Sequence, residues 1–276
     1  MSIDSARVRL TALGPSQTKA YDVPCWSLKG LQCAQDKPSQ KMLVNALYTE
    51  LNMQEIRTAY APHVAPQSGV VVGVEAIRKN HIRLGNNTEL FRNKDVPADG
   101  TFLKPESAFV MSAAGCPVII AVAGEHMIVA HAGRDSLIDR FVVAGRDASR
   151  TDFSVVHAIV RTFVETKCVE KAEEIAMCMA FAIPPMVFCH PFADTVFGEY
   201  NRKLASFASS RWEGGAIITK NGVHLDLQAI FHAQAREVGV ERTWVTHSLA
   251  EHTDLAHTRD GVNRDRRNLI IVGRMT

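Results

Sequence analysis

From residue 70 onward, apolar and polar positions divide the chain into two alternating kinds of segment. Short apolar runs are typical of buried strands, whereas apolar residues recurring at intervals of three and four are typical of amphipathic helices. The runs predict strands over 70–74, 108–122, 127–130, 175–183, 214–219, 242–245 and 269–272. Gly115 interrupts the longest run, so we expect a bent or bulged central strand there.

Helices are predicted in the segments between these strands. Apolar residues recur at helical intervals over 153–164, and Thr151 or Asp152 can cap the first turn. Further helices are predicted over 40–51, 192–207 and 227–238, the last followed by Gly239 where a C-cap is expected. Because strands and helices alternate, the pattern favours one α/β unit with a mixed sheet over separate domains.

Composition and charge exclude several classes of protein. The 276 residues can bury a sizeable core, and 46% hydrophobic with 22% charged residues is ordinary for a soluble globular protein. A formal net charge of +2, without a long basic run, argues against a nucleic-acid or membrane-surface partner. No run approaches the roughly 18 apolar residues of a membrane span, and the first residues do not resemble a signal peptide. We therefore expect a cytoplasmic protein.

The cysteines are spaced irregularly through a long chain, unlike the dense disulfide framework of a small secreted protein. Most are expected to be reduced, buried thiols. The six positions are Cys25, Cys33, Cys116, Cys168, Cys178 and Cys189.

One cysteine and one histidine form the strongest candidate for chemistry. Cys116 precedes an apolar run, a Gly124-Glu125 turn follows, and His131 ends the next run, fifteen positions after the cysteine. Two adjacent strands rising about 3.3 Å per residue would return His131 to the level of Cys116. A thiolate beside an imidazole is either part of a metal site or a nucleophile with its base.

His81 is the third candidate, because it follows an apolar segment and could converge on the same pocket. Taken singly, each residue also has an ordinary structural interpretation: Cys116 as a small core residue, His81 as part of an exposed polar loop. The enzymatic hypothesis therefore requires His81, Cys116 and His131 to meet in one pocket that solvent can reach.

A second polar cluster lies near the end of the chain. Guanidinium groups offer paired donors that suit phosphate or carboxylate oxygens. The interval of five between its histidines fits neither a helical face nor strand alternation, which argues against a metal site there. The cluster comprises His247, His252, His257, Arg259, Asp260, Arg264, Arg266 and Arg267.

These segments together resemble the YfiH-like proteins, also called the laccase-domain or multicopper polyphenol oxidase-like family. Lys79-Asn80-His81 is similar to the family's Gln-x-His-Gly segment, and Ala113-Ala114-Gly115-Cys116-Pro117-Val118 to its Thr-Ala-Asp-Cys-x-Pro-Val strand. His131-Ala132-Gly133 is similar to the start of its His-Ala-Gly-Trp-Arg-Gly motif. Leu225-Asp226-Leu227 and Thr258-Arg259-Asp260-Gly261 with Arg266 resemble its closing segments. Order and spacing match together, which is more specific than any single piece.

The resemblance runs from about His81 to Ile271. It implies a single domain over 1–276, with 70–276 as a YfiH-like core and 1–60 as a divergent amino-terminal portion. The implied fold is a layered α/β sandwich in which helices flank mixed β-sheets.

The resemblance also implies a site and an activity. His81, Cys116 and His131 would form a catalytic trio that holds zinc. The substrates would be purine nucleosides, converted by phosphorolysis, by deamination of adenosine-type compounds, or both; bacterial members are linked to peptidoglycan-precursor editing. Residues for substrate or phosphate would be Arg134, Arg259, Arg266 and His257.

The chain departs from the family pattern around these residues. Gly115 stands in place of aspartate, Lys79 in place of glutamine, and Arg134-Asp135-Ser136 in place of Trp-Arg-Gly. Thr246-His247 falls where a Cys-Thr pair is usual, and His257 falls at a tyrosine. These replacements concern nucleoside and phosphate specificity more than the thiolate or metal chemistry.

Three hypotheses follow. With zinc, two imidazoles and a thiolate leave a fourth position for a water whose pKa falls toward about 7, suited to deamination. Without metal, Cys116 is a nucleophile that His131 deprotonates, and it attacks a carboxamide of a protein glutamine or a peptidoglycan precursor. Cytotoxic necrotizing factor-type toxins, on a similar fold, use this chemistry on protein glutamine. The third hypothesis is a catalytically inactive binding module. Copper-dependent phenol oxidation is disfavoured, since no His-x-His pair occurs.

Overall fold

The computed structural model describes ten segments of the chain. They are residues 3–13, 18–32, 37–64, 69–84, 88–113, 115–146, 154–182, 184–187, 189–246 and 266–274. Within them, no helix is both long and apolar enough to cross a membrane.

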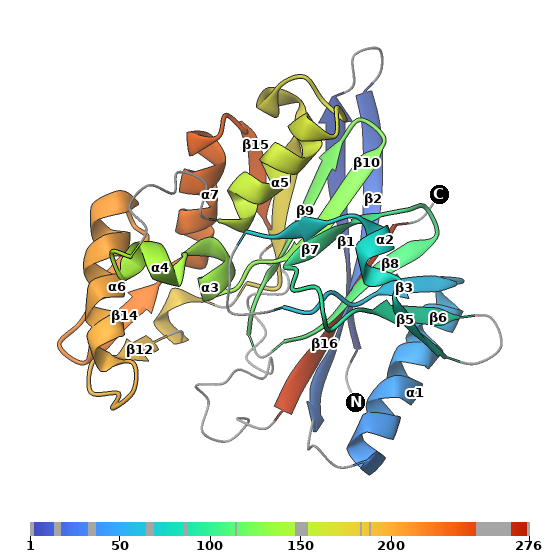
Figure 1. Ribbon diagram of the computed structural model, residues 1–276, viewed down its shortest axis with the longest axis horizontal. Helices are drawn as coiled ribbons and strands as arrows, with labels where there is room; N and C mark the ends of the chain where they lie inside the picture. The colour runs from blue at the N-terminus through green and yellow to red at the C-terminus, as the bar shows by residue number, and fades with distance from the viewer. Residues whose placement is uncertain are drawn as a thin grey trace.

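Two mixed β-sheets form the centre of the molecule (Figure 1). In the described part of the chain the larger sheet has seven strands, in the order β1 (Ile3–Leu13), β2 (Thr18–Gln32), β16 (Arg266–Arg274), β8 (Ser107–Ala113), β3 (Thr58–Tyr60), β6 (Glu89–Arg92) and β5 (Asn80–Arg83). The other has six described strands, in the order β15 (Arg242–Val245), β11 (Ala176–Ala180), β9 (Val118–Ala123), β10 (His126–His131), β7 (Gly100–Leu103) and β4 (Val71–Val72). Both contain parallel and antiparallel pairs, for example β3 with β8 and β10 with β9.

The helices of the described segments pack around the sheets, and one short helix contacts the core between the two large sheets. They are α1 (Lys37–Met53), α2 (Val74–Ile77), α3 (Arg134–Leu137), α4 (Arg140–Val143), α5 (Val155–Glu165), α6 (Gly198–Arg211) and α7 (Leu227–Glu237). Two 3-10 turns, η1 (Ala172–Glu174) and η2 (Pro185–Val187), lie in connections. A small sheet of β12 (Cys189–Pro191), β14 (Gly222–Leu225) and β13 (Ala216–Ile218) carries α6 at one side of the molecule (Figure 1).

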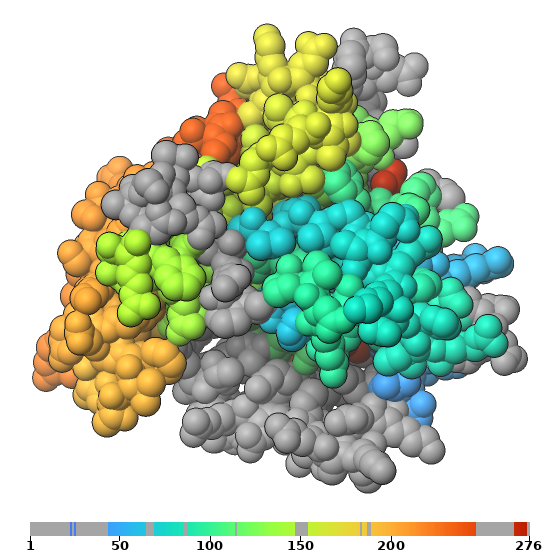
Figure 2. All heavy atoms as spheres, viewed as in Figure 1, coloured from blue at the N-terminus to red at the C-terminus, as the bar shows by residue number. Residues whose placement is uncertain are grey.

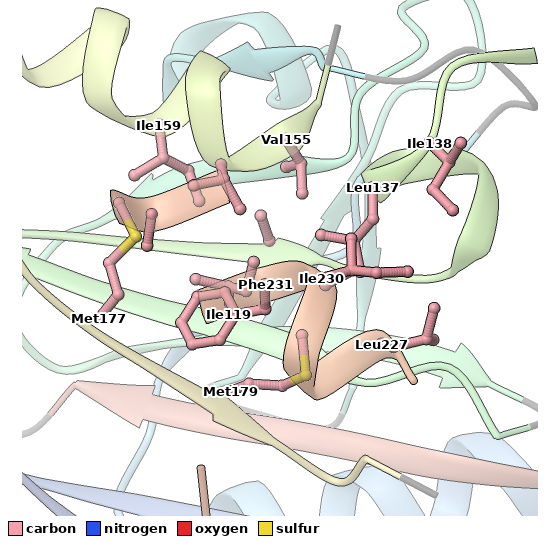
Figure 3. Packing of buried hydrophobic residues seen from close by; sticks show 14 of the residues in the cluster. Ile119, Leu137, Ile138, Val155, Ile159, Met177, Met179, Leu227, Ile230 and Phe231 are labelled. Atoms are coloured by element: carbon pink, nitrogen blue, oxygen red, sulfur yellow. The ribbon is translucent and has the colours of Figure 1, made fainter. Parts of the chain in front are cut away.

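Alternation along β9 and β10 explains the layers, because successive side chains point to opposite faces of a sheet. Val118 and Val129 face the core between the two sheets, where they pack with Phe109 and Val272 of the seven-stranded sheet. Ile119 faces the opposite core, which α5 and α7 cover with residues such as Ile159 and Phe231 (Figure 3). A third cluster packs α1 against the outer face of the seven-stranded sheet. The result is the layered α/β sandwich with mixed sheets and flanking helices that the sequence indicated.

Three predicted elements need correction. The run 108–122 is two strands, β8 and β9, in different sheets, and Gly115 between them has φ +88°. Ser154 caps α5 in place of Thr151 or Asp152, which lie outside the described residues. The helix expected over 192–207 begins only at Gly198, because the Asp194 carboxylate accepts from the backbone N–H groups of the next turn and holds it as a loop.

The first sixty residues contain more regular structure than the sequence indicated. Besides α1, which contains the predicted helix, they form the long antiparallel hairpin of β1 and β2. Strand β2 pairs with β16, so the amino-terminal hairpin is joined to the core through a strand from the far end of the sequence.

Candidate functional site

The hairpin of β9 and β10 brings Cys116 and His131 together, as the sequence indicated. His131 lies opposite Val118 in the register, and the N–H of Ala132 donates to the carbonyl of Pro117 at 2.8 Å. Cys116 is two residues before Val118, so its side chain leaves the hairpin on the same face as His131. Both side chains are partly exposed at the end of the core between the two sheets.

Gly133 shows how close the two reactive atoms lie. A Cβ atom built on this glycine would stand 2.7 Å from His131 Nε2 and 3.1 Å from Cys116 Sγ. The sulfur and the imidazole nitrogen therefore face the same patch of backbone, and a hydrogen bond links them. Only glycine leaves room for this approach, because any larger residue would press into both side chains.

Behind His131 lies a buried polar pair. His131 Nδ1 is 2.8 Å from Ser136 Oγ, and Ser136 Oγ donates to Asp99 Oδ1 at 2.6 Å. Asp99 Oδ1 is itself 3.6 Å from Nδ1, and the Asp99 side chain is 1% exposed. Asp99 precedes β7, where Gly100 lies opposite Ala130; a Cβ on Gly100 would be 2.4 Å from that of Ala130, so the strands approach closely.

Electrostatics favour a charged Cys116–His131 pair. Burial raises the pKa of the Cys116 thiol, but the charge and hydrogen bond of His131 lower it, and the net result lies below the ordinary value. Burial likewise lowers the pKa of His131, whereas the negative charges of Cys116 and Asp99 and the hydrogen bond with Cys116 raise it to about 10. Both shifts favour the thiolate form of Cys116 and the imidazolium form of His131.

Arg134 lies beside the pair but is engaged with other groups. Its guanidinium donates to both Asp135 oxygens, at 2.7 and 3.1 Å, and to His190 Nδ1 at 3.1 Å. Arg134 and Arg140 each lie over the Tyr200 ring, with guanidinium carbons 5.6 and 5.8 Å from its centroid. Figure 2 shows α4 against α6, the helices that carry Arg140 and Tyr200.

His81 does not join the other two candidates, which corrects the expectation of a three-residue pocket. It lies on β5, the edge strand of the seven-stranded sheet, where its exposed ring is 5.9 Å from that of Phe91. Within the described segments, no three His, Cys, Asp or Glu side chains are arranged to hold a metal ion. Cys116 and His131 supply two ligand types for zinc, and the described residues do not complete the set.

The carboxy-terminal cluster lies almost entirely outside the described residues. This holds for His257 and Arg259 and for the other positions from 247 to 265. Arg266 begins β16, where it pairs with Gln32 of β2. Their proposed contact with substrate or phosphate stays a prediction.

Sequence reasoning did not find Asp99 and treated Ser136 only as a departure from a family motif. Asp99 precedes a glycine and an apolar run, which is a common way to enter a strand and carries no catalytic signal. Ser136 lies one helical turn after Gly133, a spacing that gains meaning only when α3 is seen to fold back over His131. Their contact joins positions 37 residues apart and depends on β7 pairing with β10.

Sequence comparison leaves the chain without matches, since no family model and no curated protein matches it. Structure comparison is more informative. A hypothetical protein YfiH from Bacillus licheniformis superposes with a TM-score of 0.62 at 13% identity, covering 92% of this chain and 93% of the other. The chain has the YfiH-like fold.

Two further structures share the YfiH-like fold. YlmD from Geobacillus stearothermophilus gives a TM-score of 0.59 at 14% identity, over 99% of this chain and 92% of that one. A Neisseria meningitidis protein of the DUF152 family gives a TM-score of 0.55 at 16% sequence identity, over 97% of this chain and 99% of that one. The matches to the Geobacillus and Neisseria structures span 99% and 97% of this chain, so they include most of the β1–β2 hairpin region as well as the segment that carries Cys116 and His131.

Proposed function

We propose that this protein is a metal-independent cysteine hydrolase that converts a carboxamide to a carboxylate and ammonia. Cys116 is the nucleophile, and His131 is the acid and base. The observation that carries the proposal is the meeting of Cys116 Sγ and His131 Nε2 above Gly133. The lowered pKa of Cys116 and the raised pKa of His131 support the proposal, because they favour a cysteine in the nucleophilic thiolate form.

In the first half of the reaction, the Cys116 thiolate attacks the carboxamide carbon and the carbonyl oxygen takes up the negative charge. Pro117 has no N–H and cannot donate to that oxyanion, so we assign this role to the backbone N–H of Cys116. The His131 imidazolium then gives its Nε2 proton to the nitrogen of the leaving group. The C–N bond breaks, ammonia departs, and a thioester with Cys116 remains.

In the second half, the neutral His131 removes a proton from water. The resulting hydroxide attacks the thioester carbon, and the C–S bond breaks to release the carboxylic acid, which ionises. Thiolate and imidazolium are restored, so no oxidant, reductant or metal is consumed. The partial exposure of both side chains gives substrate and water access to them.

The groups beside the sulfur support a carboxamide as the substrate group. The Arg134 and Asp135 charges both act on Cys116, and the two side chains pair with one another, so the charge beside the nucleophile is already balanced. A carboxamide is neutral and therefore needs no free counter-charge at this position. A phosphate would compete with Asp135 for the Arg134 guanidinium, and this disfavours phosphorolysis at this position.

The test is an assay of chelator-treated protein with three substrate sets, read by mass spectrometry. The sets are glutamine- and asparagine-containing peptides, a mixture of folded proteins, and purine nucleosides with and without phosphate. We expect a gain of about 1 Da at a carboxamide and no product from nucleosides. Hydroxylamine should capture an acyl group from wild-type Cys116 and none from Cys116→Ala.

Zinc-dependent nucleoside chemistry gives the opposite pattern. Conversion of a nucleoside that is lost on chelation and restored by zinc would reject the proposal. So would carboxamide hydrolysis that persists in Cys116→Ala, because the covalent step would then be unnecessary.

A further inference from the structure

A buried chain of hydrogen bonds runs from His131 through Ser136 to Asp99. Ser136 is 2% exposed and Asp99 is 1% exposed, so water has little access to either side chain. We propose that Asp99, acting through Ser136, fixes the proton of His131 on Nδ1 and thereby keeps Nε2 available to the Cys116 sulfur. The proposal rests on the hydrolase function above and assigns Asp99 and Ser136 as positioning residues.

The direction of each hydrogen bond follows from what each group can donate. A carboxylate oxygen only accepts, so Ser136 must give its single O–H to Asp99 Oδ1. Only lone pairs then remain on Ser136 Oγ for the imidazole, 2.8 Å away. His131 Nδ1 must therefore carry a proton and donate it to Ser136. With Nδ1 protonated, Nε2 is the atom that takes and returns the proton in catalysis.

Asp99 is held in this orientation by its second oxygen. Oδ2 accepts the backbone N–H of Val70 at 3.2 Å, and the backbone carbonyl of Asp99 accepts the N–H of His131 at 2.8 Å. Both carboxylate oxygens of Asp99 thus accept a hydrogen bond. Replacing the oxygen that faces Ser136 with an N–H donor would force Ser136 to accept there. With the carboxylate in place, the hydrogen bonds from His131 to Asp99 allow one consistent set of proton positions.

This arrangement makes Asp99→Asn an informative variant. The Asn oxygen would keep the Val70 N–H, because that donor needs an acceptor, and the NH2 group would face Ser136. Ser136 would then accept from Asn and donate its own O–H to His131 Nδ1. The imidazole proton would move to Nε2 and point at the sulfur, which leaves no acceptor for the thiol proton. A near-isosteric change would therefore reverse the tautomer.

Ser136→Ala gives a different result. It removes the hydroxyl that links His131 to Asp99. Asp99 Oδ1 is left 3.6 Å from His131 Nδ1, too far for a direct hydrogen bond without movement. The imidazolium loses stabilisation while no group forces the opposite tautomer. Ser136→Thr retains a hydroxyl and should restore part of the function.

A matched control exists on the other side of α3. Gln234 Nε2 donates to the carbonyl of Leu137 at 2.7 Å in a fully buried site, and it has no link to His131. Gln234→Met removes a buried hydrogen bond to the same helix. It should lower stability in the way that loss of Ser136 does, without affecting proton positions at the site.

The experiment measures Cys116 alkylation by iodoacetamide from pH 5 to 10 at the peptide level, together with the ¹⁵N shifts of His131 in histidine-labelled protein. We expect the thiol midpoint to rise by at least about one unit in Asp99→Asn and Ser136→Ala, which is about tenfold less thiolate below the midpoint. The shifts should show protonated Nδ1 in wild type and the Nε2–H tautomer in Asp99→Asn. Gln234→Met should match wild type in both measurements.

The two proposals fail in different ways. If Asp99→Asn and Ser136→Ala keep the wild-type midpoint and tautomer, the positioning role is wrong, whether or not the protein hydrolyses carboxamides. If the midpoint and tautomer shift as expected but no carboxamide is hydrolysed by wild type, the positioning role stands and the hydrolase function is wrong. A midpoint that shifts equally in Gln234→Met would show that loss of packing alone explains the effect and would also overturn the role.

Discussion

Gly133→Ala is the most direct test of the geometry at the site. The substitution adds one methyl group at a point 2.7 Å from His131 Nε2 and 2.8 Å from its Cε1. Gly133 has φ −67° and ψ 175°, which alanine adopts without strain. The added carbon therefore acts through its contacts with the two reactive side chains.

The size of the effect follows from these distances. Non-bonded carbon contacts are most favourable at about 3.5 to 4.0 Å, so the imidazole must retreat by roughly 0.8 Å. A misplacement of about 1 Å in a catalytic group can cost about 10²-fold in rate. The same movement stretches the Nδ1 to Ser136 bond beyond 2.8 Å. Overpacking costs roughly 1 to 3 kcal/mol. Lower chain entropy in the unfolded state offsets about 0.4 to 1 kcal/mol.

A matched control is available in Gly73→Ala. Gly73 is also the residue before a four-residue helix, with φ −67° and ψ 154°, and a Cβ there meets no atom within 4 Å. It reports the backbone effect of the same substitution without the steric contact. We expect Gly73→Ala to keep wild-type thiol reactivity.

The assay combines alkylation of Cys116 by iodoacetamide at pH 6.5 with urea unfolding. The expected result for Gly133→Ala is a loss of about 10²-fold in alkylation rate, with at most about 2.6 kcal/mol lost in stability. Alkylation within twofold of wild type would refute the reasoning. It would mean that Sγ and Nε2 do not face Gly133 as described.

Three further predictions concern the same pair. His81→Ala should leave Cys116 alkylation and carboxamide hydrolysis unchanged, because His81 is exposed on edge strand β5; reduced alkylation would connect it to the site after all. Dialysis against a chelator should not change the alkylation profile, and a profile that depends on added zinc would count against the metal-independent mechanism. For stability against pH, the lowered pKa of Cys116 gives a contribution present above its ordinary pKa and lost as pH falls through the lowered value. The raised pKa of His131 gives a second contribution to stability, which is fully present below about pH 6.5 and is lost as pH rises through about 10. The opposing slopes cancel in between, so urea unfolding should show a stability difference between wild type and Cys116→Ser that is level near neutral pH and shrinks at both extremes.

The part of the site that the sequence predicted is the part made by local structure. Cys116 and His131 belong to one hairpin, and the Gly124-Glu125 turn with an apolar run on each side was enough to place them together. The helix over 227–238 was equally accessible, since Asp226 caps it and Gly239 follows it with φ +81°. In these segments the spacing of the hydrophobic residues and the turn or capping residues predict the same element with the same ends.

Long-range pairing accounts for what the sequence did not predict. An apolar run does not reveal that it leaves one sheet and enters another, as 108–122 does at Gly115. Strand β2 contains Pro24, which disfavours a strand in sequence reasoning, yet Thr18 to Leu28 of β2 pair with β1. His81 was grouped with the pair by position along the chain, although strand order places it at a sheet edge.

The register of the β9–β10 hairpin also fixes the number of residues that can separate Cys116 from His131. Because facing residues in this register have positions that sum to a constant, adding one residue to either strand would turn His131 toward the helices and away from the sulfur. An interval of fifteen between the cysteine and the histidine is therefore a geometric signature that mutation cannot easily lengthen or shorten. Distant homologues that retain this chemistry should be recognisable by that interval, even where every neighbouring motif has diverged.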